Sequence, residues 1–266
     1  MVSGTDIRPS AVSGSFYPED KKELSSQLKS FFKNTKEKQP NKSIKALIVP
    51  HAGYIYSGQT AAWGYRQLPQ NTRNGHFALI GPSHQYPFKG LVGSPSDFWQ
   101  TPLGILKHIP AKDRNKHLVL DSRPHVSEHC LEVQLPFLQY LYPDKIGVSI
   151  SCFLTGFNVD QKESAFYFLK YYPSAIFIIS SDLSHYLPEN IAREKDKKTI
   201  EAIVNYDSRY FFSEENAACG TGGILILMDM AKKESWKNEL IYYDTSATAY
   251  GDKNAVVGYA AIGFYN

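Results

Sequence analysis

Short apolar runs alternate along this chain with segments in which apolar residues recur at helical spacing. Continuous apolar runs bounded by turn residues are typical of buried strands, and the three clearest lie at 46–49, 77–80 and 175–179. More mixed runs predict further strands at 90–93, 147–151, 240–243 and 256–264. Helical spacing predicts helices that begin near Asp20 and that span 57–68, 160–172, 189–206 and 224–231. In the helix at 160–172, Phe166 and Leu169 are expected to face the core.

Strands that alternate with helices over the whole length predict an α/β fold, with a central mixed, mostly parallel sheet and helices on both faces. No internal repeat, linker or break in composition divides the chain, so a single domain over residues 1–266 is expected. The pattern predicts a loop at 98–104. It also predicts a helix over 125–141, in which Pro136 marks either the start or a kink. Residues 107–124 show no pattern that predicts a helix or a strand.

The composition is that of an ordinary globular protein, with 42% hydrophobic residues, 21% charged residues and a net charge of +3. So small a charge does not suggest an electrostatic nucleic-acid binder, and the lysine-rich segment 33–45 is expected to be a solvated loop. No apolar run approaches the roughly 20 residues of a membrane span, and the N-terminus shows no signal pattern. Three cysteines without close pairing favour a reducing compartment. We therefore expect a cytoplasmic protein with no membrane and no nucleic-acid partner.

Three histidines, His51, His84 and His185, each follow an apolar strand and a short turn. If the three strands run in the same direction within one sheet, these imidazoles meet at its carboxyl edge, where open α/β sheets bind ligands. Imidazole is a common ligand for Zn, Fe, Cu and Ni, and a neutral histidine can also act as a general base. One such histidine would more simply cap a strand end, but three in the same context favour a shared site.

Cys219 is the candidate fourth member of this site. The glycine-rich sequence at 220–223 lets the backbone approach a ligand closely. The helix that follows has a positive end, which is expected to lower the pKa of the thiol. The alternative is a buried structural cysteine beneath a glycine-rich turn. The same glycines are a weak candidate for a phosphate-binding loop, because the Gly-x-x-x-x-Gly-Lys-Ser/Thr form is missing.

Glu128, His129 and Glu132 bring two carboxylates and an imidazole into one turn of the predicted helix, with the two acids on one face. They could bind a metal, orient a ligand or move a proton, or they could be a charge cluster at a helix start. Asp182 stands three residues before His185, where it could orient that histidine or accept from a bound group. Three other histidines lie in polar surroundings and are expected at the surface: His76, His108 and His117.

Five motifs, in this order along the chain, resemble the Memo family, whose bacterial and archaeal members are also called AmmeMemoRadiSam system protein B. The motifs are Pro-His-Ala-Gly-Tyr at 50–54, Gly-Pro-Ser-His at 81–84, Glu-His-Cys-Leu-Glu-Val-Gln-Leu-Pro at 128–136, Ser-Ser-Asp-Leu-Ser-His at 180–185, and Cys219-Gly220. The resemblance extends from about Arg8 to Phe264, which is nearly the whole chain.

The resemblance implies a fold similar to that of the class III extradiol dioxygenases, which use non-haem Fe(II). It implies that His51, His84 and Cys219 ligate the metal, iron or copper with zinc as a further alternative, and that His185 and Asp182 lie beside it. The dioxygenases place a carboxylate where this chain has a cysteine, a softer ligand that suits copper or a redox role. Some family members are linked to phosphotyrosine-peptide binding and cell motility. The prokaryotic gene association implies a radical-SAM protein as a partner.

The leading hypothesis from the sequence is a mononuclear metal protein that carries out redox or oxygen-dependent chemistry on an unknown small-molecule or peptide substrate. In it, His185 acts as acid or base and is oriented by Asp182 or Glu128, with His129 nearby. The competing hypothesis is a binding module that keeps the fold and the pocket without catalysis and recognises a peptide or a partner protein. Metal-dependent hydrolysis is a third alternative.

Overall fold

The computed structural model describes residues 6–37, 42–69, 75–111, 118–144, 147–214 and 216–266. Within them, twelve strands form one sheet. Its path runs through β1 (Ile7–Arg8), β5 (Phe98–Thr101), β6 (Gly104–His108), β8 (Val148–Thr155), β3 (Gly75–Pro82), β9 (Ile176–Ser180), β2 (Ile44–Val49), β12 (Val256–Tyr265) and β10 (His185–Leu187). Off this path, β11 (Lys237–Thr245) pairs with β12, while β4 (Leu91–Gly93) pairs with β8 and with β7 (Leu118–Leu120). The fold is α/β with a mixed, mostly parallel sheet, as the sequence predicts.

Four parallel strands, β8, β3, β9 and β2, form the centre of the sheet. Strands buried on both faces read as continuous apolar runs, which is why the predicted strands at 46–49, 77–80 and 175–179 are confirmed as β2, β3 and β9. Because the strands are parallel, the residues that follow Val49, Pro82 and Ser180 all emerge at one edge of the sheet.

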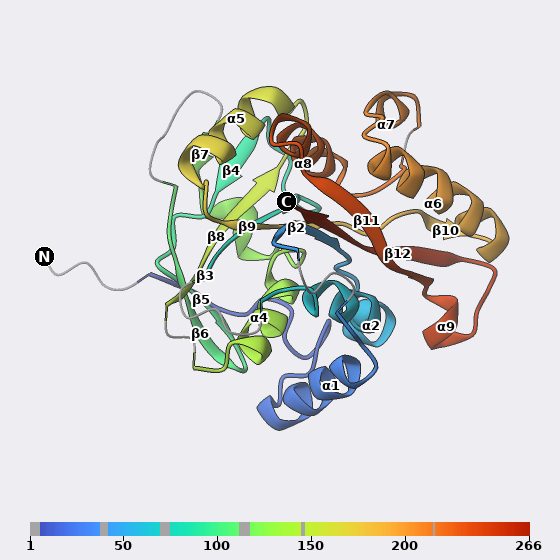
Figure 1. Ribbon diagram of the computed structural model, residues 1–266. Helices are drawn as coiled ribbons and strands as arrows, with labels where there is room; N and C mark the ends of the chain where they lie inside the picture. Colours follow the sequence, from blue (N-terminus) through green and yellow to red (C-terminus); the bar gives the residue numbers. More distant parts are fainter. Residues whose placement is uncertain (1–5, 38–41, 70–74, 112–117, 145–146, 215) are drawn as a thin grey trace, which may run out of the picture.

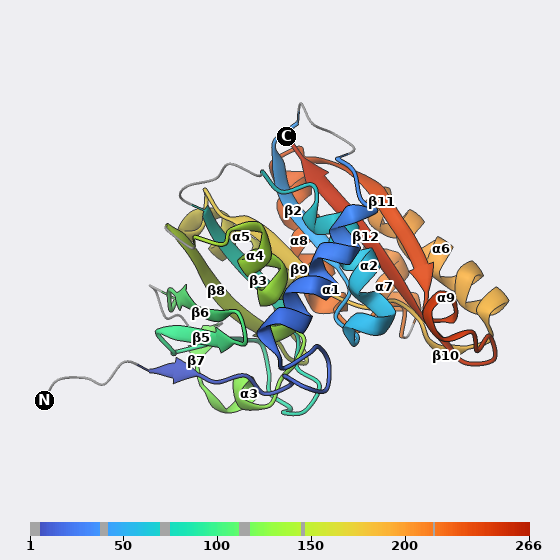
Figure 2. The ribbon, with the colours of Figure 1, turned by 90° about the horizontal axis from the view of Figure 1, so that it is seen from below.

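Helices cover both faces of the sheet (Figures 1 and 2). Alternate residues of the central strands pack against the two layers of helices. One layer contains α1 (Lys21–Lys33), α2 (Tyr54–Tyr65) and α4 (Leu135–Leu141), and it packs on Leu47 and Val49 of β2. The other contains α5 (Gln161–Tyr171), α6 (Glu189–Val204) and α8 (Thr221–Lys233), and it packs on Ala46 and Ile48 of the same strand. The period of two along β2 therefore separates the two cores.

Local signals fix several helix ends. Asp20 caps α1, where its carboxylate accepts from the backbone N–H groups of Lys22 and Glu23. Pro136 lies in the first turn of α4, so it marks a start and not a kink. The remaining helices are short: α3 (Arg123–Val126), the 3-10 helix η1 (Glu132–Gln134), α7 (Arg209–Ser213) and α9 (Ala247–Tyr250).

Three expectations from the sequence are wrong. The segment 98–104 is not a loop but forms β5 and the start of β6, a hairpin that turns at Pro102 and Leu103 and continues from Gly104, where φ is +113°. Residues 127–131 are not helical, so the predicted helix over 125–141 is interrupted. Phe166 does not face the core but is 51% exposed; the buried residues of α5 are Ser164, Ala165, Tyr167 and Phe168. Among the described helices, none is long and apolar enough to cross a membrane.

Candidate metal centre

The edge of the sheet where β2, β3 and β9 end carries the candidate site. His51 follows β2 after Pro50, and His84 follows β3 after Ser83, as the three parallel strands require. The two imidazole rings approach each other edge to face, with their centroids 5.1 Å apart. The prediction that these two histidines meet at one edge is therefore confirmed.

Cys219 completes this group from another part of the chain. It lies just before α8, and its Sγ is 3.2 Å from Nε2 of His51. Ligand atoms of His51, His84 and Cys219 all lie within 4.8 Å of one another, so the three side chains could hold one metal ion. Gly220 makes this approach possible, because a Cβ there would stand only 2.6 Å from Cβ of Ser181.

Ser180, at the end of β9, fixes the tautomer of His51. Its hydroxyl donates to the carbonyl of Cys130 at 2.6 Å, which uses its one proton. The same oxygen therefore accepts from Nδ1 of His51 at 2.9 Å and from the amide of Gln134 at 2.8 Å. With the proton of His51 on Nδ1, Nε2 presents its lone pair toward Cys219, as a metal ligand must.

Glu128 performs the same task for His84. Its Oε1 lies 3.0 Å from Nδ1 of His84, and its Oε2 accepts the backbone N–H of that residue at 2.7 Å. A carboxylate behind a histidine orients the ring and increases its basicity, an arrangement found behind many metal-bound histidines. The donor set, two imidazoles with free Nε2 atoms and one thiol, fits a soft or borderline ion such as copper, zinc or iron.

Burial controls the charges of this group. It lowers the pKa of His51 to about 4, against the opposing charge of Asp182, so that ring is neutral near pH 7 and able to ligate. Burial alone would raise the pKa of Glu128, but hydrogen bonds from His129 and His84 outweigh it and lower the pKa. Burial, and then the charge of Asp182, raise the pKa of Cys219. The backbone N–H of Gly220 at the helix start lowers it, as expected, but burial is the larger effect and the expected net lowering is not found. A bound cation is what would favour the thiolate.

His129 and Cys130 lie behind the three candidate ligands. The ring of His129 stacks on His84 with centroids 4.7 Å apart and lies 5.3 Å from His51, and its Nδ1 is 3.1 Å from Oε1 of Glu128. His84, Glu128 and Cys130 form a second group with ligand atoms within 4.8 Å. In that group the carboxylate already holds the imidazole, and the thiol donates to the carbonyl of Pro82 at 3.1 Å. The second group therefore supports the first group and is not a separate candidate metal site.

Asp182 and His185 are placed differently from the expectation. Asp182 does not orient His185; its Oδ1 accepts the backbone N–H of His51 at 2.7 Å, and Oδ2 is 3.9 Å from Nε2 of that residue. His185 is exposed, and its Nδ1 lies 2.8 Å from the carbonyl of Leu183. Glu128 likewise contacts His84 and His129. Both carboxylates thus contact candidate ligand histidines and not His185: Asp182 contacts His51, and Glu128 contacts His84.

Glu132 does not share a face with Glu128, because the chain between them is not helical. It is fully buried and forms an ion pair with Arg8 at 2.5 Å. Its oxygens also accept from the hydroxyl of Tyr17 and from two backbone N–H groups of the N-terminal segment. Glu132 therefore holds the N-terminal segment, and it lies outside both groups of candidate ligands.

Two cavities flank the candidate ligands, and His185 lines both. One, of about 450 Å³, also touches Asp182 and His129. The other, of about 510 Å³, also touches His84 and Cys219. A substrate in the second cavity would contact two of the candidate ligands directly, whereas one in the first would contact Asp182 and His129, which lie next to His51.

Sequence reasoning missed several residues of this region. Ser180 and Gln134 lie within two of the motifs that resemble the Memo family, at 180–185 and 128–136, but neither was assigned a role. Tyr259 lies on β12 in the first cavity, where burial and then the charge of Asp182 raise the pKa of its phenol.

The expectation that His108 is a surface residue is wrong, since it is 3% exposed. His76 is half-buried, and His117 lies outside the described residues.

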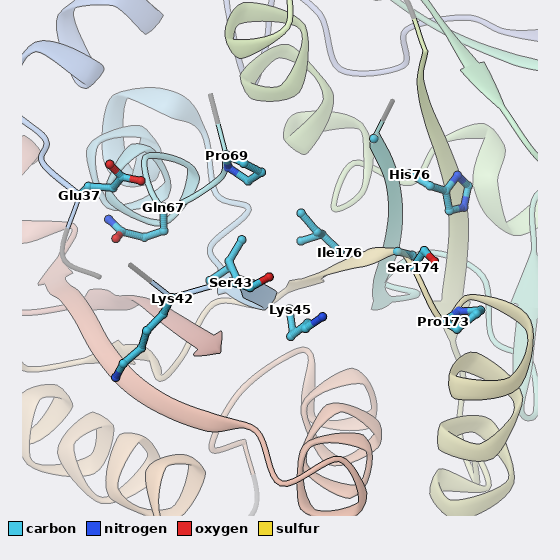
Figure 3. A pocket seen from close by; sticks show the side chains of 13 residues that line it. Glu37, Lys42, Ser43, Lys45, Gln67, Pro69, His76, Pro173, Ser174 and Ile176 are labelled. Carbon is cyan, nitrogen blue, oxygen red and sulfur yellow. The ribbon is translucent and has the colours of Figure 1, made fainter. Parts of the chain in front are cut away.

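A cavity at the opposite end of the same strands offers a contrast (Figure 3). Lys42 and Lys45 lie beside it at the start of β2, and His76 lines it from the start of β3. Both ring nitrogens of His76 have hydroxyl partners, Ser149 at 2.8 Å and Ser151 at 3.2 Å. No group of candidate metal ligands among the described residues lies there, so the carboxyl edge remains the candidate site.

Comparisons with known proteins show which family this chain is similar to. The family model described as "Memo-like protein" matches residues 8–263, which include all the residues of the candidate site. A MEMO1 family protein of Methanosarcina barkeri is 35% identical, over 96% of this chain and 99% of its own. One of Thermoplasma acidophilum is 36% identical, over 96% and 97%. Among solved structures, the uncharacterized protein JW3007 from Escherichia coli K12 has a TM-score of 0.45 and 10% identity, over 83% of this chain and 99% of that one. That last likeness is too distant to support an argument.

Proposed function

This chain belongs to the Memo-like family, and on that premise we propose that it is a mononuclear metal protein whose ion is held by His51, His84 and Cys219. The observation that carries the proposal is the convergence of the three side chains within 4.8 Å. The prior orientation of both imidazoles by Ser180 and Glu128 supports it.

We propose Fe(II) or copper as the ion, because a thiolate beside two imidazoles is a softer donor set than two histidines and a carboxylate. Such an ion would supply redox chemistry toward oxygen or an organic substrate. The protein's contribution is to hold the neutral rings of His51 and His84 in place. It also provides two cavities beside the group, of which the one of about 510 Å³ is lined by His84 and Cys219.

His185 is the proposed acid or base of the reaction. The carbonyl of Leu183 can only accept a hydrogen bond, so the proton of a neutral His185 lies on Nδ1. Its Nε2 is then a proton acceptor. Because the residue lines both cavities, this nitrogen is available to a substrate bound in either of them.

Metal analysis of protein purified without added metal tests the proposal. We expect close to one equivalent of iron or copper in the parent protein. His51→Ala and Cys219→Ser should lose most of it. Cys152→Ala is the matched control, since Cys152 is buried in β8 and belongs to neither candidate group. Unchanged metal content in His51→Ala and Cys219→Ser would remove the proposed site.

Oxygen consumption in the presence of a panel of catechols and other reductants tests the redox part. Turnover that is lost in His185→Gln, with metal content retained, would support His185 as acid or base. A protein that is loaded with metal but inert toward every compound would favour the alternative proposal. In that alternative, this chain binds a peptide or a partner protein at the same edge.

A further inference from the structure

The cavity of about 450 Å³ beside the candidate metal centre has a distinctive lining, and we call it the aromatic cleft. Its walls come from the N-terminal segment, the start of α2, the turn after β9, β10, α9 and β12. Its lining residues include five aromatic and two acidic side chains: Phe16, Tyr56, Tyr186, Tyr250, Tyr259, Asp182 and Asp252.

The chemistry of this lining favours positive charge. The faces of phenol and phenyl rings carry negative potential and attract ammonium groups, most strongly where several rings surround them. Asp182 and Asp252 add two carboxylates, and no lysine or arginine is among the lining residues. The other titratable side chains of the lining are the imidazoles of His129 and His185. An anion in the aromatic cleft would thus face two carboxylates with no lysine or arginine beside them.

Two of the tyrosines have the features of ligand contacts. Tyr186 and Tyr250 are 76% and 72% exposed, although large aromatic side chains are usually covered. Tyr186 also has a φ of +57°, a left-handed conformation that non-glycine residues rarely adopt. Tyr250 faces Tyr56 edge to face at 6.1 Å between centroids. The fold thus keeps aromatic surface open at the mouth of the cleft.

The aromatic cleft is adjacent to the candidate metal centre, because two of its lining residues contact His51. Asp182, on its floor, accepts the backbone N–H of His51 at 2.7 Å. His129, on its wall, lies with its ring centroid 5.3 Å from that of His51. A molecule in the cleft would therefore be separated from His51 by these two side chains only.

From these observations we propose that the aromatic cleft binds an organic cation, an amine or quaternary ammonium group on an aromatic or aliphatic body. We further propose that the substrate of the metal centre belongs to this class, a statement that rests on the proposed function. Binding of the cation itself depends only on the lining of the cleft.

The cavity of about 510 Å³ on the other side of His185 has a lining of opposite charge, so binding of an anion there is the competing outcome. It contains Lys195, whose Nζ lies 2.8 Å from a carboxylate oxygen of Glu214, and it contains no acidic side chain among its lining residues. An anionic ligand would prefer that cavity. Comparison of matched cations and anions therefore distinguishes binding in the aromatic cleft from binding in the cavity that contains Lys195.

Three compounds that share one phenol body and differ in their tail provide the test: tyramine, the neutral tyrosol, and the anion 3-(4-hydroxyphenyl)propionate. Titration calorimetry with the metal-containing protein should rank tyramine tightest and the anion weakest. Asp252→Asn should weaken tyramine about threefold to fivefold, the range of an exposed ion pair, and should leave tyrosol unchanged. Tyr250→Ala should weaken both. Asp229→Asn is the matched control, since Asp229 lies in α8 beside a different cavity.

Metal content is measured in every preparation, so failure of the metal-centre proposal can be distinguished from failure of the cation-site proposal. Loss of the expected metal with an intact preference for tyramine would remove the metal centre and leave the cation site. An anion that binds as tightly as tyramine would overturn the inference. So would an affinity for tyramine that Asp252→Asn does not change.

Discussion

Replacement of Glu128 by glutamine tests whether the carboxylate behind His84 prepares the metal site or only holds the loop. Its Oε1 accepts from Nδ1 of His84 at 3.0 Å and from the backbone N–H groups of His129 and Cys130 at 2.9 and 3.1 Å. Its Oε2 accepts the backbone N–H of His84 at 2.7 Å. The side chain is 2% exposed, so water cannot replace a lost acceptor.

Glutamine has nearly the same shape but only one accepting oxygen. Whichever way the amide lies, its NH2 group meets at least one buried N–H donor, and the negative charge is gone. A hydrogen bond to a charged group contributes about 1.5–3 kcal/mol, so we expect the free energy of unfolding to fall by about 2 kcal/mol. Loss of an outer-shell partner typically weakens metal binding about 10- to 100-fold, and we expect an increase of that size in the metal dissociation constant.

The dissociation constant is measured by competition with a chromophoric chelator, and stability by urea denaturation of the chelated protein. Glu214→Gln is the control, because Glu214 pairs with Lys195 at the surface and contacts neither imidazole. It should change neither quantity by more than a small amount. A Glu128→Gln protein that is less stable but binds the ion as tightly as the parent would refute the reasoning. Glu128 would then be a structural residue only.

The remaining predictions concern stability. Arg8→Met leaves the carboxylate of Glu132 buried without its cation, so urea denaturation should show a loss of about 3–5 kcal/mol, and a loss below about 1 kcal/mol would contradict the pairing. Gly220→Ala places a Cβ 2.6 Å from Cβ of Ser181, so it should cost about 1–3 kcal/mol and also reduce metal content. Burial lowers the pKa of His108 to about 4 and that of His125 to about 3, so the unfolded state, with a pKa near 6.5, binds more protons. Stability should therefore fall as pH decreases below about 6.5, by up to about 1.4 kcal/mol per pH unit for each histidine, until the folded pKa is reached. His108→Gln should reduce this slope in pH-dependent denaturation, and an unchanged slope would show that His108 does not cause it.

The parts of the fold that could be predicted are those whose signal is local. β2, β3 and β9 are buried on both faces, so each is a continuous apolar run in the sequence. His51 and His84 follow two of these runs directly. Once the strands are taken as parallel, the meeting of these histidines follows without further information. Cys219 required the additional observation of glycines at the start of a helix.

The parts that could not be predicted depend on contacts between distant segments. Arg8 and Glu132 are 124 positions apart, and nothing near either residue indicates its partner. Asp182 is close to His185 in sequence, which suggested that it orients this residue, but the turn after β9 directs its carboxylate to His51. The hairpin of β5 and β6 was missed because it contains Pro102 and Gly104 and has little apolar alternation. Turn residues dominate its local signal.

The loop from Glu128 to Glu132 connects the N-terminal segment to the candidate metal centre. At one end, Glu132 pairs with Arg8, and the guanidinium of Arg8 also donates to the carbonyl of Glu128 at 2.7 Å. In the middle, the carbonyl of Cys130 accepts from Ser180, which in turn holds His51. At the other end, the carboxylate of Glu128 holds His84. Because both candidate ligand histidines are supported through this one loop, a substitution of Arg8 should weaken binding of the proposed ion, although Arg8 belongs to neither group of candidate ligands.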